Sequence, residues 1–359
     1  MQEPLIIHGS SRHTKGKIGY GVIYVKAESP FTLAELAQLW GSYQNDSLAQ
    51  CVMSYFIRHV EDPEIRSCVD ESLALSMQHL DALTVFFNKA NCPIPVGFTA
   101  EDVYPDAPPL FSDLFVLYYI QQMGVLGMNT VSVSLAYSTR NDLRTYFSSC
   151  QSEYMALFNK TTDLLLSKGL YIRSPYIPMP KEAVFVQSRQ FLGSLTGKQR
   201  PLAALEAADL FSNMQRNALG RAMLTGFSQV AQSEKVRNYL IKGKGIAAKH
   251  IEMFSSALST ADLPASMTWD VEVTDSTTPP FSDKLLMFHT TALITSGLGY
   301  YGTSMATTMR KDLQIMYTRL SAEVAKYAGE GAVLMIDEGW FEEPPMVPDR
   351  DALAKKNKQ

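Results

Sequence analysis

Cysteine and excess positive charge are both scarce in this sequence of 359 residues, and each scarcity excludes a class of protein. All the cysteines lie in the first half of the chain: Cys51, Cys68, Cys92 and Cys150. A disulfide-stabilised secreted protein is expected to use cysteine throughout, and no pair here has metal-binding spacing. We therefore interpret the four thiols as small apolar side chains in a reducing environment. The formal net charge of -4 leaves no basic field for a phosphate backbone, so no nucleic-acid partner is expected.

Common catalytic and targeting motifs are also missing. No GxSxG, HExxH or EF-hand pattern occurs, and Glu3 precedes a short apolar run, unlike the start of a secretory signal peptide. These features predict a cytoplasmic protein. The uncharged stretch 114–139 is long enough to cross a bilayer, but polar residues interrupt it. We interpret it as a buried helix and predict no membrane span.

Two glycine-rich segments approach nucleotide-binding motifs without meeting their requirements. GLGYYG, residues 297–302, satisfies GxGxxG but lies inside a helical pattern, so we attribute its glycines to close packing of helix backbones. GSLTGKQ, residues 193–199, has the wrong spacing for a phosphate loop and lacks its Ser or Thr. We interpret the second segment as part of a linker.

What the chain does contain is a tandem repeat. FSDLFVLYYI, which begins at Phe111, returns as FSDKLLMFHT, which begins at Phe281 at an offset of 170 residues. Upstream, LWGSYQNDSLAQ from Leu39 matches LFSNMQRNALGR from Leu210 at an offset of 171. A unit of this length is a domain rather than a solenoid repeat, so the chain is a domain written twice.

Apolar residues within each unit recur at helical spacing. In the first unit, one helix is expected after a capping box at Thr32–Glu35, and the next helices are expected to begin near Pro63 and at Ser112 or Asp113. A long joint at 91–110 separates helices two and three, whereas the other joints are short. The predicted fold is all-α: two tandem ferritin-like four-helix bundles, each with a long crossover between helices 2 and 3.

The predicted division of the chain follows from these boundaries. It consists of an N-terminal extension (1–30), a first bundle (31–175), a linker (176–201), a second bundle (202–345) and a C-terminal tail (346–359). The segment GYGVIYVKA in the extension fits either a short strand or a surface segment. The polar end of the tail is expected to be frayed.

Polar residues recur at the same depth of the two predicted bundles. They are His79 and Glu153 with Gln44 beside them, and His250 and Glu323 with Gln215 beside them. A buried polar layer must be satisfied by hydrogen bonds, a metal or a trapped molecule, so a structural layer, a metal site and a small-ligand pocket are all open interpretations. The Glu-x-x-His pairs of a di-iron bundle are missing, which leaves either no cofactor or a single iron, manganese or zinc ion.

Two further features have simpler interpretations. His289 has no counterpart in the first unit, where Tyr119 occupies its place, so we expect a local core or surface residue. Arg140 and Arg310 each precede an aspartate by two residues at the corner between helices three and four. We expect the aspartates to favour the helix start and the arginines to bind nearby carbonyl groups or the other bundle.

Several segments together are similar to a known family. PIPVGFTAEDV, LFSDLF, TRNDLRTYF and GFSQVAQSEKVRNYLIKGKGIAAKH closely resemble tandem ferritin-like domains of spore-forming bacilli, whose shorter relatives are labelled spore coat proteins akin to coat protein F. The resemblance covers about residues 30–350. It implies two four-helix bundles without the iron ligands of ferritins, and it implies no particular activity.

Two functions follow as hypotheses. The first is a non-enzymatic structural or interaction protein, cytoplasmic or spore-associated, that binds protein partners or itself. The second is a metal- or small-molecule-binding bundle whose His/Glu layer supports oxidative or storage chemistry.

Overall fold

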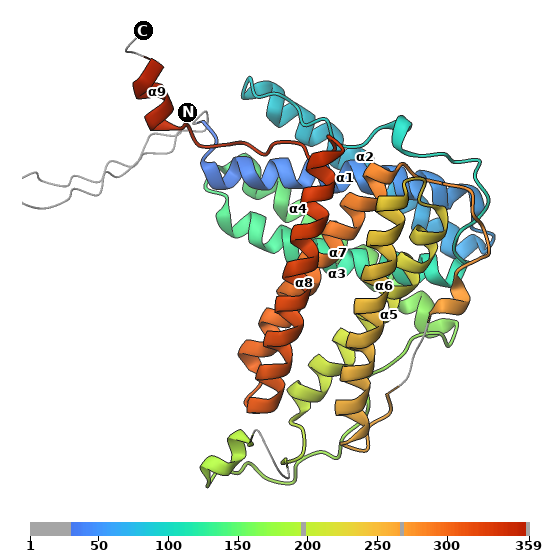
Figure 1. Cartoon of the computed structure of the whole chain (residues 1–359), viewed down its shortest axis with the longest axis vertical. Coiled ribbons are helices and arrows are strands. Elements are labelled where there is room, and N and C mark those ends of the chain that lie inside the picture. The colour runs from blue at the N-terminus through green and yellow to red at the C-terminus, as the bar shows by residue number, and fades with distance from the viewer. Residues whose placement is uncertain (1–29, 195–198, 266–268, 357–359) are drawn as a thin grey trace, which may run out of the picture.

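Two groups of four long helices make up the molecule. The computed structural model describes residues 30–194, 199–265 and 269–356, and within them it contains no strand beyond two isolated β-bridges. The first group comprises α1 (Leu33–His59), α2 (Pro63–Lys89), α3 (Asp113–Tyr137) and α4 (Asn141–Ser167). The second comprises α5 (Ala204–Val230), α6 (Glu234–Ser259), α7 (Asp283–Thr307) and α8 (Lys311–Asp337). The predicted all-α fold of two tandem four-helix bundles is confirmed, and Figure 1 shows the two bundles crossing each other.

The helix ends follow the local signals in the sequence. Thr32 and Glu35 form the predicted capping box at the start of α1, and Pro63 occupies the first turn of α2. Gly169 has a positive φ of 69° just after α4, the left-handed conformation that glycine adopts at least cost. The long crossover between α2 and α3 and its counterpart between α6 and α7 contain only the short 3-10 helices η1 (Ala100–Asp102) and η3 (Asp270–Glu272) among their described residues.

Each of the repeated FSD segments caps one helix and hydrogen-bonds to the turn between the first two helices of its bundle. Ser112 accepts a hydrogen bond from the Phe115 amide and so caps α3, while Asp113 accepts the Asp62 amide at 2.7 Å in the hinge between α1 and α2. Ser282 and Asp283 make the equivalent contacts in the second bundle. The repetition seen in the sequence therefore preserves one local device in both copies.

The crossovers join the bundles in a two-fold arrangement. Val103 pairs with Phe281, and Phe111 pairs with Val273, which are equivalent contacts with the roles of the copies exchanged. Two cap hydroxyls follow the same pattern, since Ser282 donates to Asp102 and Ser112 donates to Glu272. One apolar core includes residues of both bundles.

Some predictions fall outside the described residues or need correction. The N-terminal extension lies outside them except for Pro30, and the linker contains the short helix η2 (Arg189–Leu192). The described part of the tail forms α9 (Arg350–Lys356), where fraying was expected, because Asp349 accepts the amides of Asp351 and Ala352 and so caps the helix; residues 357–359 lie outside the described residues.

The explanation given for GLGYYG was also wrong. A Cβ atom at Gly297, Gly299 or Gly302 would meet nothing within 4 Å, so close helix packing does not require these glycines. The equivalent Gly127 differs, because a Cβ there would collide with the ring of Tyr154. The motif does lie inside α7, as its helical pattern indicates.

The uncharged stretch 114–139 belongs mainly to α3, and Phe115, Leu117 and Ile120 of that helix are buried in the protein core. Among the described residues, no helix combines the length and the apolar character that crossing a membrane requires.

Candidate functional site

Each bundle brings its predicted histidine and glutamate together. His79 on α2 lies opposite Glu153 on α4, with 2.8 Å between Nε2 and Oε2. His250 on α6 lies opposite Glu323 on α8, with 3.2 Å between the same atoms. Both histidines are buried, while their glutamates retain some exposure. The duplicated unit therefore carries the same polar contact twice.

A second acidic side chain lies within hydrogen-bond distance of the other ring nitrogen of His79. Asp46, from α1, places Oδ1 3.2 Å from Nδ1, and the Tyr154 hydroxyl donates to the same oxygen at 3.4 Å. Burial lowers the pKa of His79, but hydrogen bonds with Asp46 and Cys150 outweigh burial and raise the pKa to about 11. The raised pKa favours the imidazolium form of the ring at neutral pH, while burial raises the pKa of Asp46 on its other edge.

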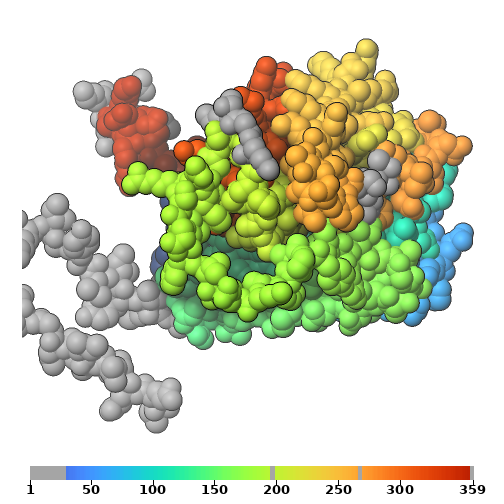
Figure 2. Space-filling model, turned by 90° about the horizontal axis from the view of Figure 1, so that it is seen from below, coloured from blue at the N-terminus to red at the C-terminus, as the bar shows by residue number. Residues whose placement is uncertain are grey.

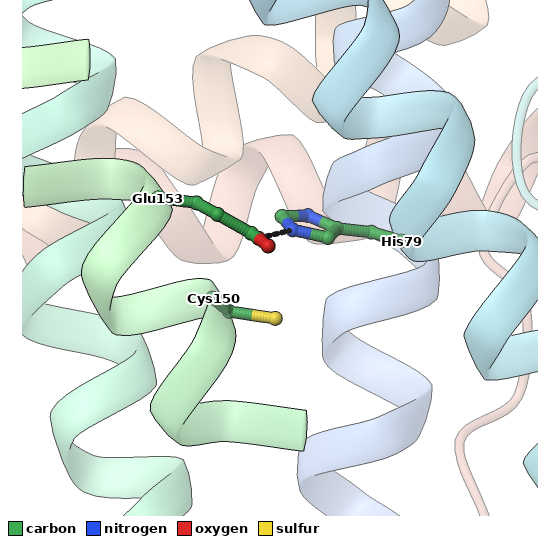
Figure 3. A group of neighbouring side chains, drawn as sticks. All are labelled: His79, Cys150 and Glu153. Atoms are coloured by element: carbon green, nitrogen blue, oxygen red, sulfur yellow. Dashed lines mark hydrogen bonds and ion pairs between the residues drawn. The ribbon is translucent and has the colours of Figure 1, made fainter. Parts of the chain in front are cut away.

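Cys150 completes a possible ligand set one helical turn before Glu153. Figure 3 shows both side chains pointing from α4 toward His79. The ligand atoms of His79, Cys150 and Glu153 lie within 4.8 Å of one another. Ligand atoms around tetrahedral zinc lie about 3.3–3.8 Å apart, given bond lengths of about 2.0–2.3 Å. The ligand atoms would have to approach one another by about 1 Å to close around an ion.

The surroundings of this group suit metal binding in two further ways. A hydrogen bond from Nδ1 to Asp46 fixes the orientation of the His79 ring, as carboxylates commonly do for ligating histidines, and a metal would replace the Nε2 proton that now lies between His79 and Glu153. A cavity of about 110 Å³, lined in part by Asp46, His79, Tyr146 and Cys150, adjoins the group. The cavity can hold water or a small molecule beside an ion.

The second bundle surrounds its pair differently. Nδ1 of His250 lies 2.9 Å from the Tyr301 hydroxyl, and Lys249 binds Glu323 at 2.9 Å. Burial lowers the pKa of His250, and the Lys249 ammonium lowers the pKa of Glu323. A neutral imidazole and a carboxylate already paired with an ammonium form a closed hydrogen-bonded group.

The difference lies in three neighbouring positions. The first bundle has Asp46, Cys150 and Tyr154, and the equivalent residues of the second bundle are Asn217, Leu320 and Val324. A thiol and a carboxylate are replaced by an apolar and a neutral amide side chain. The donors that could hold a metal are thus concentrated in the first bundle.

The two glutamines expected beside the histidines lie elsewhere. Gln44 donates to Glu342 after α8, at 2.5 Å, and Gln215 donates to the Ile172 carbonyl after α4, at 3.2 Å. Counting turns from the hinge gave the correct depth but the wrong face, because two residues along a helix rotate the side chain by about 200°. Asp46, two residues beyond Gln44, is the residue that faces His79.

Asp46 and Cys150 were missed by the sequence analysis. Cys150 and Glu153 have a Cys-x-x-Glu spacing, which puts both side chains on one face of a helix, and this signal could have identified the thiol. Cys150 does pack in an apolar cluster, as an apolar filler would, but its thiol also lies beside a histidine and a carboxylate.

His289 is a core residue, but its contact is not local. Its Nε2 lies 2.6 Å from the hydroxyl of Tyr119, the residue at the equivalent position of the other copy. The contact therefore lies on the approximate two-fold axis between the bundles. Burial lowers the pKa of His289 to about 4, so the ring is neutral at pH 7.

Fold and sequence together define the class of protein. The chain is a tandem duplication of a four-helix bundle with a buried polar site in each copy. It belongs to the family described as "Protein of unknown function (DUF3231)", whose model matches twice, over residues 22–183 and 190–353. Both the tandem repeat and the family resemblance are confirmed by this double match.

One solved structure and the curated proteins complete the comparison. A structure described as a "putative spore coat protein" from Bacillus halodurans C-125 is similar to this chain, with 19% sequence identity and a TM-score of 0.40. The similarity covers 42% of this chain and 98% of that chain. No curated protein matches the sequence.

Proposed function

We propose that the first bundle binds one divalent transition-metal ion, preferentially zinc, through His79, Cys150 and Glu153. The observation that carries the proposal is the convergence of the three ligand atoms within 4.8 Å. Thiolate, imidazole and carboxylate are ligands that zinc accepts together, whereas manganese favours oxygen-rich sites. Asp46 supports the same assignment because it orients the histidine ring.

Three protein ligands leave one tetrahedral position for water or a small molecule, which is typical of zinc sites that do more than stabilise a fold. The cavity beside Cys150 can contain that fourth ligand. Because His79 and Cys150 must lose protons to bind a metal, binding is expected to release protons and to weaken as the pH falls. In the second bundle, His250 and Glu323 have a structural role in this proposal.

Metal analysis of the purified protein after zinc loading and gel filtration tests the proposal. We expect about one zinc ion per chain, lost in His79→Ala and in Cys150→Ala. His250→Ala and Cys68→Ala are the matched controls, because they remove an equivalent histidine and another buried thiol without touching the ligand set. At a free zinc concentration 100 times Kd, the wild type should gain about 2.7 kcal/mol in unfolding free energy.

Two results would contradict metal binding. One is wild-type protein that contains no stoichiometric zinc, and the other is zinc that remains bound in both ligand variants. Either outcome favours the alternative, in which both His/Glu pairs are hydrogen-bonded structural contacts. In that case the ferritin-like topology that we propose for each unit, based on its single long crossover, carries a purely structural protein.

A specific feature favours a second role in protein interaction, either with another protein of the spore or with a second copy of this chain. The linker exposes large apolar side chains at Tyr176, Met179, Val184 and Phe185, and the last of these is 90% exposed. Figure 2 shows the linker, in yellow-green, running along the outside of the molecule. Several exposed large apolar side chains in one segment are a feature that contact surfaces often have.

A further inference from the structure

The two bundles contain equivalent, partly open cavities on either side of the approximate two-fold axis. The cavity in the second bundle has a volume of about 150 Å³, and the cavity in the first has about 110 Å³. Tyr119, Met123 and Leu293 line both cavities, so α3 and α7 form the wall between them. Neither cavity is the polar space beside Cys150.

The cavity of the second bundle is larger because an aromatic ring is missing from its wall. In the first bundle, the Tyr154 ring covers Gly127 so closely that a Cβ atom there would collide with it. The equivalent pair in the second bundle is Val324 and Gly297, and a Cβ atom at Gly297 would meet nothing within 4 Å. The remaining wall is mostly apolar and includes Met223, Leu224 and Ile246.

One permanently charged side chain lines this mostly apolar space. Arg216 occupies the position that Asn45 has in the first bundle, and its Cζ lies 3.6 Å from the centroid of the Tyr300 ring. Its Nε is buried and has no hydrogen-bond partner among the described residues, although the charge of Asp209 acts on the guanidinium. No carboxylate is found among the described residues of the cavity wall.

Arg216 is half-buried, its buried Nε lacks a hydrogen-bond partner, and Asp209, the carboxylate whose charge acts on it, does not line the cavity, so the cavity side of the guanidinium favours an anion. Desolvation lowers the pKa of Arg216, and a bound carboxylate would compensate the charge and satisfy the free donor. The other titratable group at the cavity, His250, is neutral because burial lowers its pKa. The charge of the wall is therefore that of Arg216 alone.

We propose that the cavity of the second bundle binds a small amphipathic monoanion, with its carboxylate on Arg216 and a compact apolar body between α5, α6 and α7. An apolar cavity of about 150 Å³ is large enough for a benzene ring. The fitting class is therefore an aromatic or branched short-chain carboxylic acid. This site is separate from the metal site proposed for the first bundle, and either can exist without the other.

Isothermal titration of the full chain with benzoate, phenylacetate, 3-phenylpropionate and 4-methylpentanoate tests the proposal. At least one of these acids should bind saturably at one site per chain, and its neutral amide should bind about tenfold or more weakly. Arg216→Asn, which introduces the residue of the first bundle, should reduce the preference for acid over amide to about twofold or less.

A pair of glycine variants locates the binding. Gly297→Leu should abolish binding because the new side chain fills the cavity, whereas Gly299→Leu should bind normally because Gly299 is exposed and does not line it. The proposal is wrong if no acid binds saturably up to about 10 mM. It is also wrong if Gly297→Leu binds as well as the wild type, or if wild-type protein binds acid and amide equally.

Discussion

Two buried carboxylates should make the stability of this protein strongly dependent on pH. Glu35 and Glu206 occupy the same position of the two copies, and each closes the start of a helix while tying it to a distant corner. Glu35 accepts the amides of Thr32 and Arg140 at 2.8 and 2.9 Å. Glu206 accepts the amide of Arg310 at 3.2 Å and also pairs with Arg200.

The magnitude follows from the pKa values. Burial raises the pKa of both carboxyl groups, but hydrogen bonds outweigh it and lower each pKa to about 2. Because the folded-state pKa lies below the unfolded value near 4.5, the stabilisation is fully present above about pH 4.5 and is lost as the pH falls toward 2. With 1.36 kcal/mol per pKa unit, each group contributes about 3 kcal/mol at pH 6 and loses about 2 kcal/mol by pH 3.

Urea unfolding of Glu35→Gln, Glu206→Gln and the double variant, at pH 6 and pH 3, measures both contributions. Each single variant should lower the unfolding free energy by about 2–3 kcal/mol at pH 6 and by about 1 kcal/mol at pH 3. The losses should add in the double variant because the sites lie in different bundles. Glu101→Gln, at an exposed position, is the control. Variants that match the wild type at pH 6, or that keep its full pH dependence, would refute the assignment.

Two further predictions concern the bundle interface and the linker. The wild type should lose about 2 kcal/mol of unfolding free energy between pH 7 and pH 5, because a buried histidine with a pKa of about 4 gains a proton on unfolding. His289→Gln should abolish this loss. If the melting temperatures at the two pH values differ as much in the variant as in the wild type, the prediction is wrong. Val184→Ser combined with Phe185→Ser should abolish self-association in sedimentation experiments without changing the melting temperature, since both side chains are exposed; wild-type protein that is already monomeric at about 100 μM would argue against a linker contact between copies.

The helices could be predicted well because their signals are local. Thr32 and Glu35 cap α1 through atoms three residues apart, and Ser112 caps α3 in the same way. Such contacts depend on neighbouring residues alone, so they can be predicted from the sequence. Because the unit is repeated, each of these signals also predicts a helix start in the second copy, and Ser282 caps α7 accordingly.

The site was predicted less completely because its contacts cross between helices. Helical counting gives depth along an axis, which is why His79 and Glu153 were correctly brought to one level. Facing direction depends on how each helix is rotated in the bundle, and that rotation is set by packing over the whole core. Asp46 was therefore missed in favour of Gln44, although the two differ by only two residues.

The contact between Tyr119 and His289 could not be predicted from the sequence for a different reason. It joins equivalent positions of the two copies, and it exists only because the bundles pack about an approximate two-fold axis. The local contact of Tyr119, whose ring stacks on Phe115, gives no indication of its partner in the other copy. A comparison of the copies showed that the residues differ, but not that they touch.

A single position links the two proposed sites. Tyr154 donates a hydrogen bond to Asp46 beside the metal-binding group, and its ring also fills the space over Gly127. Valine at the equivalent position, Val324, can do neither, so the second bundle lacks this support for a histidine site and gains an open cavity instead. Because the Tyr154 ring occupies part of this space, the first bundle combines its polar site with a smaller cavity, of about 110 Å³ against about 150 Å³ in the second bundle. The two copies represent these two solutions.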